Sequence, residues 1–185
     1  MKLSVKRLLI KQIKNGIKKG VIMDKKLIES LNSQMNFELY SSYIYLSMGS
    51  YLKSLDLNGF ANWMDIQVKE EIAHVDKFYN FLHERGENVE FDAIPKPQHK
   101  WDSALAVFEH ALEHEKIVTK RINDLVDQAI KVSDHATLNF LQWFVGEQVE
   151  EEASVMSVVQ QIKLVGDSLF LLDRELGLRV FNPPA

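Results

Sequence analysis

Apolar side chains recur every three or four positions in four long stretches of the chain, which is the spacing of residues on one face of an α-helix. Capping and turn residues separate these stretches. We therefore predict four long helices and a short apolar fifth helix, over residues 24–52, 58–85, 102–131, 135–165 and 168–176. The predicted fold class is all-α.

The connection between the second and third predicted helices is long and irregular, since residues 86–101 include Pro95 and Pro97. Its 16 residues can extend over about 50 Å, whereas a helix of about 28 residues is only about 42 Å long. The chain can therefore cross the whole bundle before the third helix begins. We predict a four-helix bundle with one long crossover plus a short fifth C-terminal helix, formed by residues 23–178, and a C-terminal tail over 179–185.

Composition and charge limit the function classes. The absence of cysteine excludes a disulfide framework, a thiolate metal site and a cysteine nucleophile. No apolar run is long enough to span a bilayer, so we expect a cytoplasmic protein with neither a membrane nor a nucleic-acid partner. Seven of the 22 basic residues lie in residues 1–22, which leaves 15 bases, 26 acids and a net charge of −11 in the rest of the chain.

Residues 1–22 form a basic N-terminal extension that contains no acidic residue and has apolar residues at a roughly helical spacing. Three interpretations are open. The extension is a basic amphipathic arm for a membrane surface or a polyanion, a flexible segment, or the product of translation begun upstream of a functional start at Met23. None of them contributes to the predicted bundle.

Each of the four long helices interrupts its apolar stripe with a carboxylate near its middle. These carboxylates belong to Glu38, Glu71, Glu115 and Glu151. His74 lies one turn after Glu71 on the same face, although a Glu-x-x-His pair alone is more often solvated or hydrogen-bonded than functional. Four further polar residues approach the same layer: Glu70, Glu147, Gln148 and Glu150.

Buried acids in this number require a cation. An unpaired buried carboxylate costs several kcal/mol, and no Lys or Arg falls on the stripes at that depth. Metal ions are the remaining candidate. Many carboxylate oxygens with one imidazole and no sulfur suit iron, manganese or magnesium better than structural zinc.

Three motifs resemble those of the non-haem bacterial ferritins in order and spacing, and the resemblance covers about Met23 to Leu176. The motifs are QMNFELYSS at 34–42, EEIAH at 70–74 and NFLQWFVGEQVEEE at 139–152. The resemblance implies a ferritin-like fold and an iron storage protein. Such a protein oxidises Fe(II) with dioxygen or peroxide and keeps ferric oxide in a hollow homo-oligomeric shell of 24 subunits.

The resemblance also implies roles for the site residues. The first iron of a di-iron ferroxidase centre would be held by Glu38, Glu71 and His74. The second would be held by Glu71, Glu115 and Glu151, with Gln148 beside it. A third iron position would use Glu70, Glu147 and Glu150. Tyr45 would be an electron donor next to the pair, with Trp143 nearby; the simpler alternatives are that both residues only fill the core.

The chain lacks features of three families related to the non-haem ferritins, and these differences argue against membership of them. Bacterioferritins carry a methionine haem ligand directly after the glutamate that corresponds to Glu71, where this chain has Ile72, so we expect no haem. The fifth helix argues against the small ferritin-like shells that place iron between subunits. The lack of cysteine argues against rubrerythrin-type peroxidases with a rubredoxin domain.

Two other functions remain open from the sequence: a ferritin-like di-iron oxidase or peroxidase without storage, and a metal-free four-helix interaction protein. We expect Glu152 to face water. Five further histidines lack converging partners in the pattern, and we expect them at the surface: His83, His99, His110, His114 and His135.

Overall fold

The computed structural model describes residues 23–183, and the basic extension 1–22 lies outside the described residues. The described chain is entirely helical apart from its connections, which confirms the predicted fold class. The helices are α2 Lys25–Lys53, α3 Asn58–Glu84, α4 Ala104–Lys131, α5 His135–Val165 and α6 Phe170–Leu176. The long helices lie within two residues of their predicted bounds, and α6 begins two residues later than predicted.

The N-termini of three long helices are set by local hydrogen bonds. The side chains of Asp24, Ser103 and Asp134 accept hydrogen bonds from the backbone N–H groups three residues further on. Each bond satisfies a donor that the first turn of a helix leaves unpaired. These caps explain why helix boundaries could be located from the sequence.

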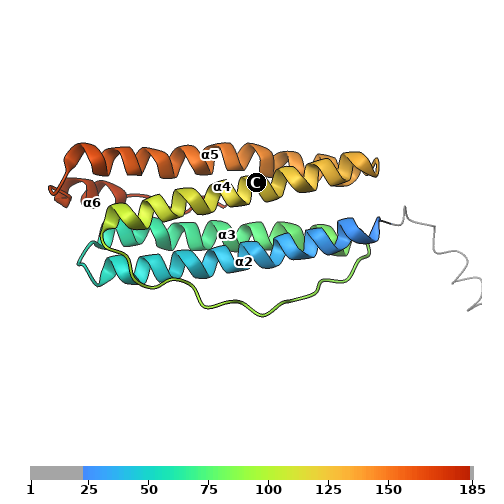
Figure 1. Ribbon diagram of the computed structural model, residues 1–185, viewed down its shortest axis with the longest axis horizontal. Coiled ribbons are helices and arrows are strands. Elements are labelled where there is room, and N and C mark those ends of the chain that lie inside the picture. Colours follow the sequence, from blue (N-terminus) through green and yellow to red (C-terminus); the bar gives the residue numbers. More distant parts are fainter. Residues whose placement is uncertain (1–22, 184–185) are drawn as a thin grey trace, which may run out of the picture.

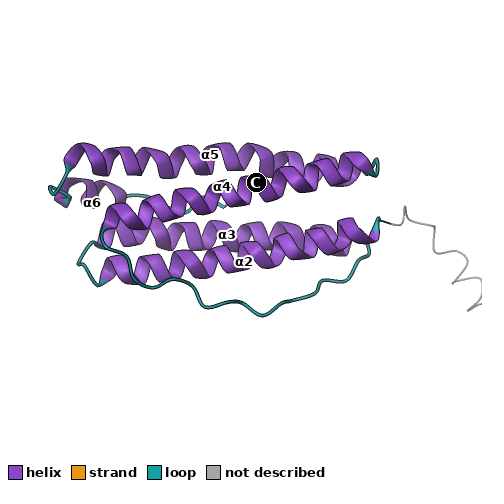
Figure 2. Cartoon of the chain, viewed as in Figure 1, coloured by secondary structure: helices purple, strands orange, loops and turns teal. Residues whose placement is uncertain are grey.

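The crossover between α3 and α4 runs along the length of the bundle, beside α2 (Figure 1). Two asparagines of α2 bind its extended backbone. Asn32 Oδ1 accepts a hydrogen bond from the N–H of Glu90 at 2.8 Å, and Asn36 Oδ1 accepts one from Asp92 at 2.9 Å. The connection carries the chain from the end of α3 back to the end of the bundle at which α3 begins. As a result, α3 and α4 run parallel, and α2 and α5 run in the opposite direction (Figure 2).

The core consists of two apolar clusters with a polar layer between them. One cluster includes Met48, Phe60 and Phe108, and the other includes Leu31 and Phe78. The layer between them contains buried glutamates from all four long helices, namely Glu38, Glu71, Glu115 and Glu151. The fold therefore holds these acids at mid-length, away from both ends of the bundle.

Helix α6 caps the N-terminus of α3, for which Leu57 provides no side-chain cap. Asp173 Oδ1 accepts hydrogen bonds from the N–H groups of Gly59 at 2.7 Å and Phe60 at 3.0 Å. This approach requires glycine at position 59, because a Cβ there would lie 1.5 Å from the carbonyl oxygen of Asp173.

Substitution of Gly59 by alanine is expected to displace α6 and to lower the free energy of unfolding by about 1–3 kcal/mol, the usual cost of overpacking. Urea unfolding followed by circular dichroism measures the change. Gly146→Ala is the matched control, since a Cβ at Gly146 in α5 meets no atom within 4 Å. The control is expected to gain about 0.5–1 kcal/mol from helix propensity, and equal losses in both variants would contradict the contact argument.

Candidate metal centre

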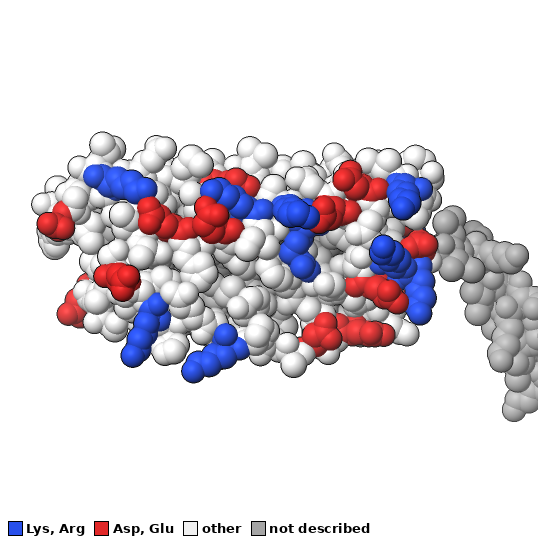
Figure 3. Space-filling view, in the orientation of Figure 1, with Lys and Arg blue, Asp and Glu red and all other residues white. Residues whose placement is uncertain are grey.

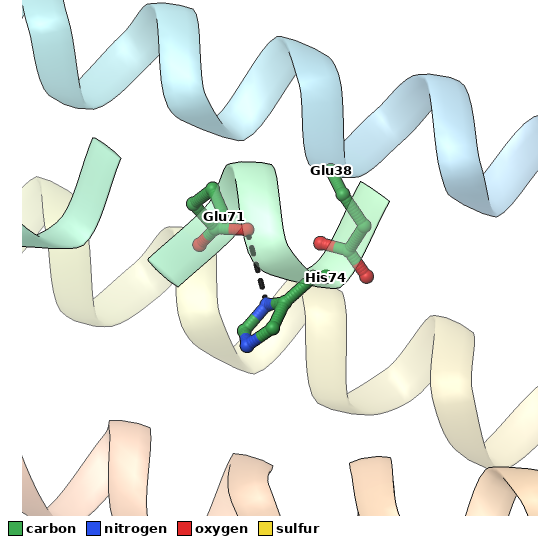
Figure 4. A group of neighbouring side chains, drawn as sticks. All are labelled: Glu38, Glu71 and His74. Carbon is green, nitrogen blue, oxygen red and sulfur yellow. Dashed lines mark ion pairs between the residues drawn. The ribbon is translucent and has the colours of Figure 1, made fainter. Parts of the chain in front are cut away.

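Glu38 of α2 and Glu71 and His74 of α3 meet in the polar layer (Figure 4). Each is at most 2% exposed, and one ligand atom from each lies within 4.8 Å of the others. Glu71 Oε2 is 3.4 Å from His74 Nδ1. Two carboxylates and an imidazole thus point at one small volume, as expected for ligands of a metal ion.

Most of the unsatisfied buried polar atoms in the described part of the chain belong to this group. Glu38 Oε2, Glu71 Oε2 and His74 Nε2 have no hydrogen-bond partner, and the fourth such atom is Oε1 of the neighbouring Gln67. A buried acceptor without a partner costs about 1–3 kcal/mol. These atoms fit a bound cation, which would supply the missing interactions.

Burial shifts the pKa value of each of these groups in the direction that favours its neutral form. Loss of hydration raises the pKa of Glu38 to about 7, although hydrogen bonds from Gln34 and Glu71 oppose the shift. Burial, followed by the charges of Glu38 and Glu115, raises the pKa of Glu71 well above its usual value. Burial lowers the pKa of His74 to about 4, with a contribution from Lys77, so its imidazole is neutral at pH 7. A metal ion must therefore displace protons from the carboxyls, whereas the imidazole is ready to bind.

Glu115 of α4 and Glu151 of α5 complete the buried layer, but other side chains hold them. The Tyr45 hydroxyl donates a hydrogen bond to Glu115 Oε1, and Gln148 Nε2 donates one to Glu115 Oε2 at 3.0 Å. Gln67 Nε2 donates one to Glu151 Oε2 at 2.8 Å. Burial raises the pKa of both Glu115 and Glu151. The sequence pattern does not mark Gln67 as a site residue, because an amide on an apolar stripe resembles an ordinary core residue.

The residues predicted for a third iron position are arranged unequally. Glu147 is half-buried and forms a second possible ligand group with His74 and Glu151, whose ligand atoms all lie within 4.8 Å of one another. Its Oε1 is 4.0 Å from His74 Nε2. Glu150 is exposed, and Glu70 pairs with the guanidinium of Arg179 at 2.7 Å. Arg179 lies in the predicted C-terminal tail, where no periodic pattern indicates a role for it.

A second arginine, Arg121, is linked to the centre indirectly, by hydrogen bonds that pass through the side-chain amide of Gln34. Gln34 Nε2 donates a hydrogen bond to Glu38 Oε1 at 2.8 Å, and Arg121 Nε donates one to Gln34 Oε1 at 2.7 Å. The positive charge of Arg121 lowers the pKa of Glu38, but burial raises it by more. Arg121 is on α4 but off its apolar stripe, so the stripe does not reveal this cation.

The expectation that His114 lies at the surface is wrong. It is 4% exposed, its Nε2 is 2.7 Å from Ser41 Oγ, and its ring stacks on Phe37. His110 is half-buried and 3.0 Å from the indole nitrogen of Trp101. His114 can be buried because Ser41 on the neighbouring helix α2 provides a hydrogen-bond partner, which the helical pattern of α4 alone does not reveal.

The other surface predictions are met in most cases. The remaining three histidines are exposed, namely His83, His99 and His135. Glu152 faces water only in part, because it accepts a hydrogen bond from Thr119 Oγ1 at 2.5 Å. Trp143 is half-buried and packs edge-on against His74, with the ring centroids 5.6 Å apart.

Acidic and basic side chains are interspersed over the face shown in Figure 3. Among the described residues on that face, no continuous basic patch of the kind that binds nucleic acid is visible. Within residues 23–183, no helix is both long and apolar enough to cross a bilayer.

A four-helix bundle with one long crossover and a buried layer of glutamates with a single histidine defines a class of carboxylate metal proteins. Comparisons with known proteins agree. A model of the family "Ferritin: Ferritin-like domain" matches residues 28–165. Bacterial non-heme ferritins of Staphylococcus saprophyticus and Staphylococcus aureus are 40% and 38% identical to the chain, and the alignments cover 87% of it and 98–99% of each relative.

Two solved structures of ferritin from the archaeon Archaeoglobus fulgidus are also similar to the chain. Both are 50% identical to it with a TM-score of 0.85, and the alignments cover 86–87% of this chain and 99–100% of theirs. One is described as an open pore ferritin and the other as an engineered closed form. The chain belongs to the ferritin family, and its function is iron storage with ferroxidase activity.

Proposed function

We propose that the buried centre binds two Fe(II) ions per chain and oxidises them as a pair. The first ion is held by Glu38, Glu71 and His74. The observation that carries this assignment is the set of three unpartnered buried atoms, one on each of these side chains. The second ion is held by Glu71, Glu115 and Glu151, with Gln148 beside it, so that Glu71 contacts both ions.

The two halves of the centre differ in how readily they accept iron. The ligands of the first ion have free acceptor atoms, whereas Glu115 and Glu151 accept hydrogen bonds from Tyr45, Gln148 and Gln67. The second ion must compete with these donors. We therefore infer ordered binding, with the first position filled before the second.

The ligands of the centre contribute to the oxidation through their charge and through their protons. Fe(II) is the substrate, and two ions supply two electrons to dioxygen or to peroxide. The carboxylates supply dense negative charge and oxygen ligands, which favour the Fe(III) product. Burial raises the pKa of Glu38 to about 7 and the pKa of Glu71 well above its usual value, so iron binding releases protons from these carboxyls that the reduced oxidant can take up.

We further propose that the ferric product passes to the cavity of a cytoplasmic shell of 24 subunits, through a third position formed by Glu70, Glu147 and Glu150. The names of the similar structures support an assembly with pores, since one is called an open pore ferritin and one a closed form. The net charge of −11 outside residues 1–22 favours the approach of cations. No haem has a role in this scheme.

Iron loading followed by size-exclusion chromatography tests the storage function. The expected result is a very large particle that retains far more iron than its centres can hold. A small oligomer that keeps about two irons per chain would instead indicate a di-iron oxidase without storage. The absence of iron uptake would indicate a metal-free interaction protein.

Tyr45→Phe tests the proposed role of Tyr45 as an electron donor. The variant loses both the oxidisable phenol and the hydrogen bond to Glu115, so the first rapid phase of Fe(II) oxidation is expected to slow by about tenfold. Stopped-flow absorbance measures the rate, and freeze-quench electron paramagnetic resonance detects a tyrosyl radical in the unmodified protein. Tyr43→Phe is the control, because Tyr43 is 43% exposed on the same helix. An unchanged rate with no radical in either protein would assign Tyr45 to core packing alone.

A further inference from the structure

The chain beyond α6 turns back along α3 and does not leave the molecule. Asn62 of α3 donates hydrogen bonds from Nδ2 to the carbonyl oxygens of Leu176 at 3.3 Å and Arg179 at 3.0 Å. In Figure 1 the red chain that follows α6 runs back from that helix toward the middle of the bundle. The segment Gly177–Arg179 is therefore attached to α3 one turn after the Gly59 contact.

Three contacts hold the guanidinium of Arg179 in place. Its Nη1 donates a hydrogen bond to the carbonyl oxygen of Trp63 at 3.1 Å, and its Cζ lies 4.4 Å from the centroid of the Trp63 ring. Its Nη2 is 2.7 Å from Glu70 Oε2. The side chains of Arg179 and Glu70 are 22% and 18% exposed, so solvent screens this pair less than an ordinary surface ion pair.

The charge of Glu70 acts on the glutamates of the polar layer and on Glu147 beside it. It lies one turn before His74 on α3, and its negative charge contributes to the raised pKa values of Glu147 and Glu151, for which burial is the larger cause. The positive charge of Arg179 acts on Glu151 in the opposite direction. Arg179 thus already supplies, at the edge of the centre, part of the charge that a metal ion would supply.

We propose that Arg179 is a positioning residue that weakens the third metal position by competing for Glu70. This inference rests on the proposed function, in which Glu70, Glu147 and Glu150 form that position. The guanidinium engages Oε2 of the Glu70 carboxylate, so an ion beside Glu147 must either displace the guanidinium or bind next to its positive charge. Both cost binding free energy, so the third position fills after the two inner positions and releases its ion readily toward the cavity.

The test uses the assembled, metal-free protein and Zn²⁺, which cannot change its oxidation state. Isothermal titration counts the ions and gives their affinities, and anomalous diffraction from crystals soaked in graded Zn²⁺ identifies which side chains bind each ion. In Arg179→Gln, the ion that contacts Glu70 is expected to bind about tenfold tighter, a difference of about 1.4 kcal/mol. The affinities of the two inner ions are expected to change by less than about twofold.

Three further variants separate competition for Glu70 from a general effect of charge or of a loosened tail. Arg174→Gln removes one positive charge from α6, just before the tail, at an exposed site, and it is expected to leave all three affinities unchanged. Arg179→Lys keeps the charge but not the planar contacts, and it is expected to bind the third ion within about threefold of the unmodified protein. Adding Glu70→Gln to Arg179→Gln is expected to abolish the gain, because the contested ligand is then absent.

Three results would overturn the proposal: an unchanged third affinity in Arg179→Gln, a gain of the same size in Arg174→Gln or Arg179→Lys, or a gain that persists without the Glu70 carboxylate. Failure of the proposed function gives a different result. In that case no Zn²⁺ ion binds between Glu38, Glu71 and His74 in any protein, whatever happens at Glu70.

Discussion

Glu71→Gln is expected to slow the initial oxidation of Fe(II) by at least about 100-fold, because the variant loses the carboxylate proposed to contact both ions. The amide is almost the same size, so the packing around it is kept. Stopped-flow absorbance after anaerobic Fe(II) is mixed with oxygenated buffer measures the rate. Isothermal titration under anaerobic conditions is expected to show fewer than two tightly bound ions per chain.

The same substitution is expected to stabilise the metal-free protein at pH 7. Glu71 is 1% exposed, and its Oε2 has no hydrogen-bond partner. A neutral amide has no proton to hold or release, so it removes the cost of placing an acid with a raised pKa among Glu38, Glu115 and Glu151. The free energy of unfolding is expected to rise by about 1–3 kcal/mol. Opposite effects on activity and stability are typical of a site whose ligands are held ready for a cation.

Glu84→Gln is the matched control, since Glu84 is an exposed glutamate near the end of the same helix. It is expected to leave the oxidation rate unchanged and to alter stability by less than about 0.5 kcal/mol. A Glu71→Gln variant that oxidised iron at the unmodified rate would show that Glu71 does not bridge the two ions. One that was strongly destabilised without metal would show that the charged carboxylate has a structural partner.

The metal-free protein is expected to lose stability as the pH rises from about 6.5 to 8, and bound metal is expected to reverse this trend. Burial raises the pKa of Glu38 to about 7 and raises those of Glu71, Glu115 and Glu151. The folded protein then keeps protons that the unfolded chain has already released. The contribution of these carboxyls to stability is therefore full below their ordinary pKa of 4.5 and is lost as the pH rises through the raised values.

Two buried histidines act in the opposite direction at lower pH. Burial lowers the pKa values of His74 and His114 to about 4, so between about 4 and 6.5 the unfolded chain binds protons that the folded protein does not. Their contribution raises stability with pH in that window and partly cancels the effect of the carboxyls. Above 6.5 only the carboxyls remain, and each lowers the free energy of unfolding by about 1.4 kcal/mol per pH unit while its pKa is not yet reached.

Urea unfolding at a fixed protein concentration, with and without saturating Zn²⁺, measures both trends. Metal binding requires deprotonated carboxylates, so its stabilising effect grows as the pH rises. The slope between pH 6.5 and 8 is expected to be shallower in metal-free Glu71→Gln, which has one titrating carboxyl fewer. A metal-free protein whose stability rose over this range would indicate that the four glutamates are ionised and paired in the folded state.

The helices and the central acids could be predicted from the sequence because both depend on local spacing. Apolar residues every three or four positions define a helix face whatever the helix packs against, and Asp24, Ser103 and Asp134 mark where helices begin. One glutamate near the middle of each stripe was enough to predict that four helices contribute to one layer. The length of the crossover determined which helices run parallel.

The site residues that no sequence pattern could place depend on contacts between distant segments. The burial of His114 depends on Ser41, which is 73 positions away. Arg121 reaches Glu38 only through Gln34, and Arg179 reaches Glu70 only because the chain after α6 folds back along α3. No periodic pattern within one helix contains such information.

By itself, the sequence determined the helical bundle, its crossover and the four buried glutamates with His74, because helical periodicity and the cost of burying charge act within each segment. Only the tertiary structure decided which acids remain free for a cation and which are already engaged by Tyr45, Gln67, Gln148 or Arg179. The physical reason is that a hydrogen bond or an ion pair depends on distances of about 3 Å between atoms of different helices, and these distances exist only once the helices have packed.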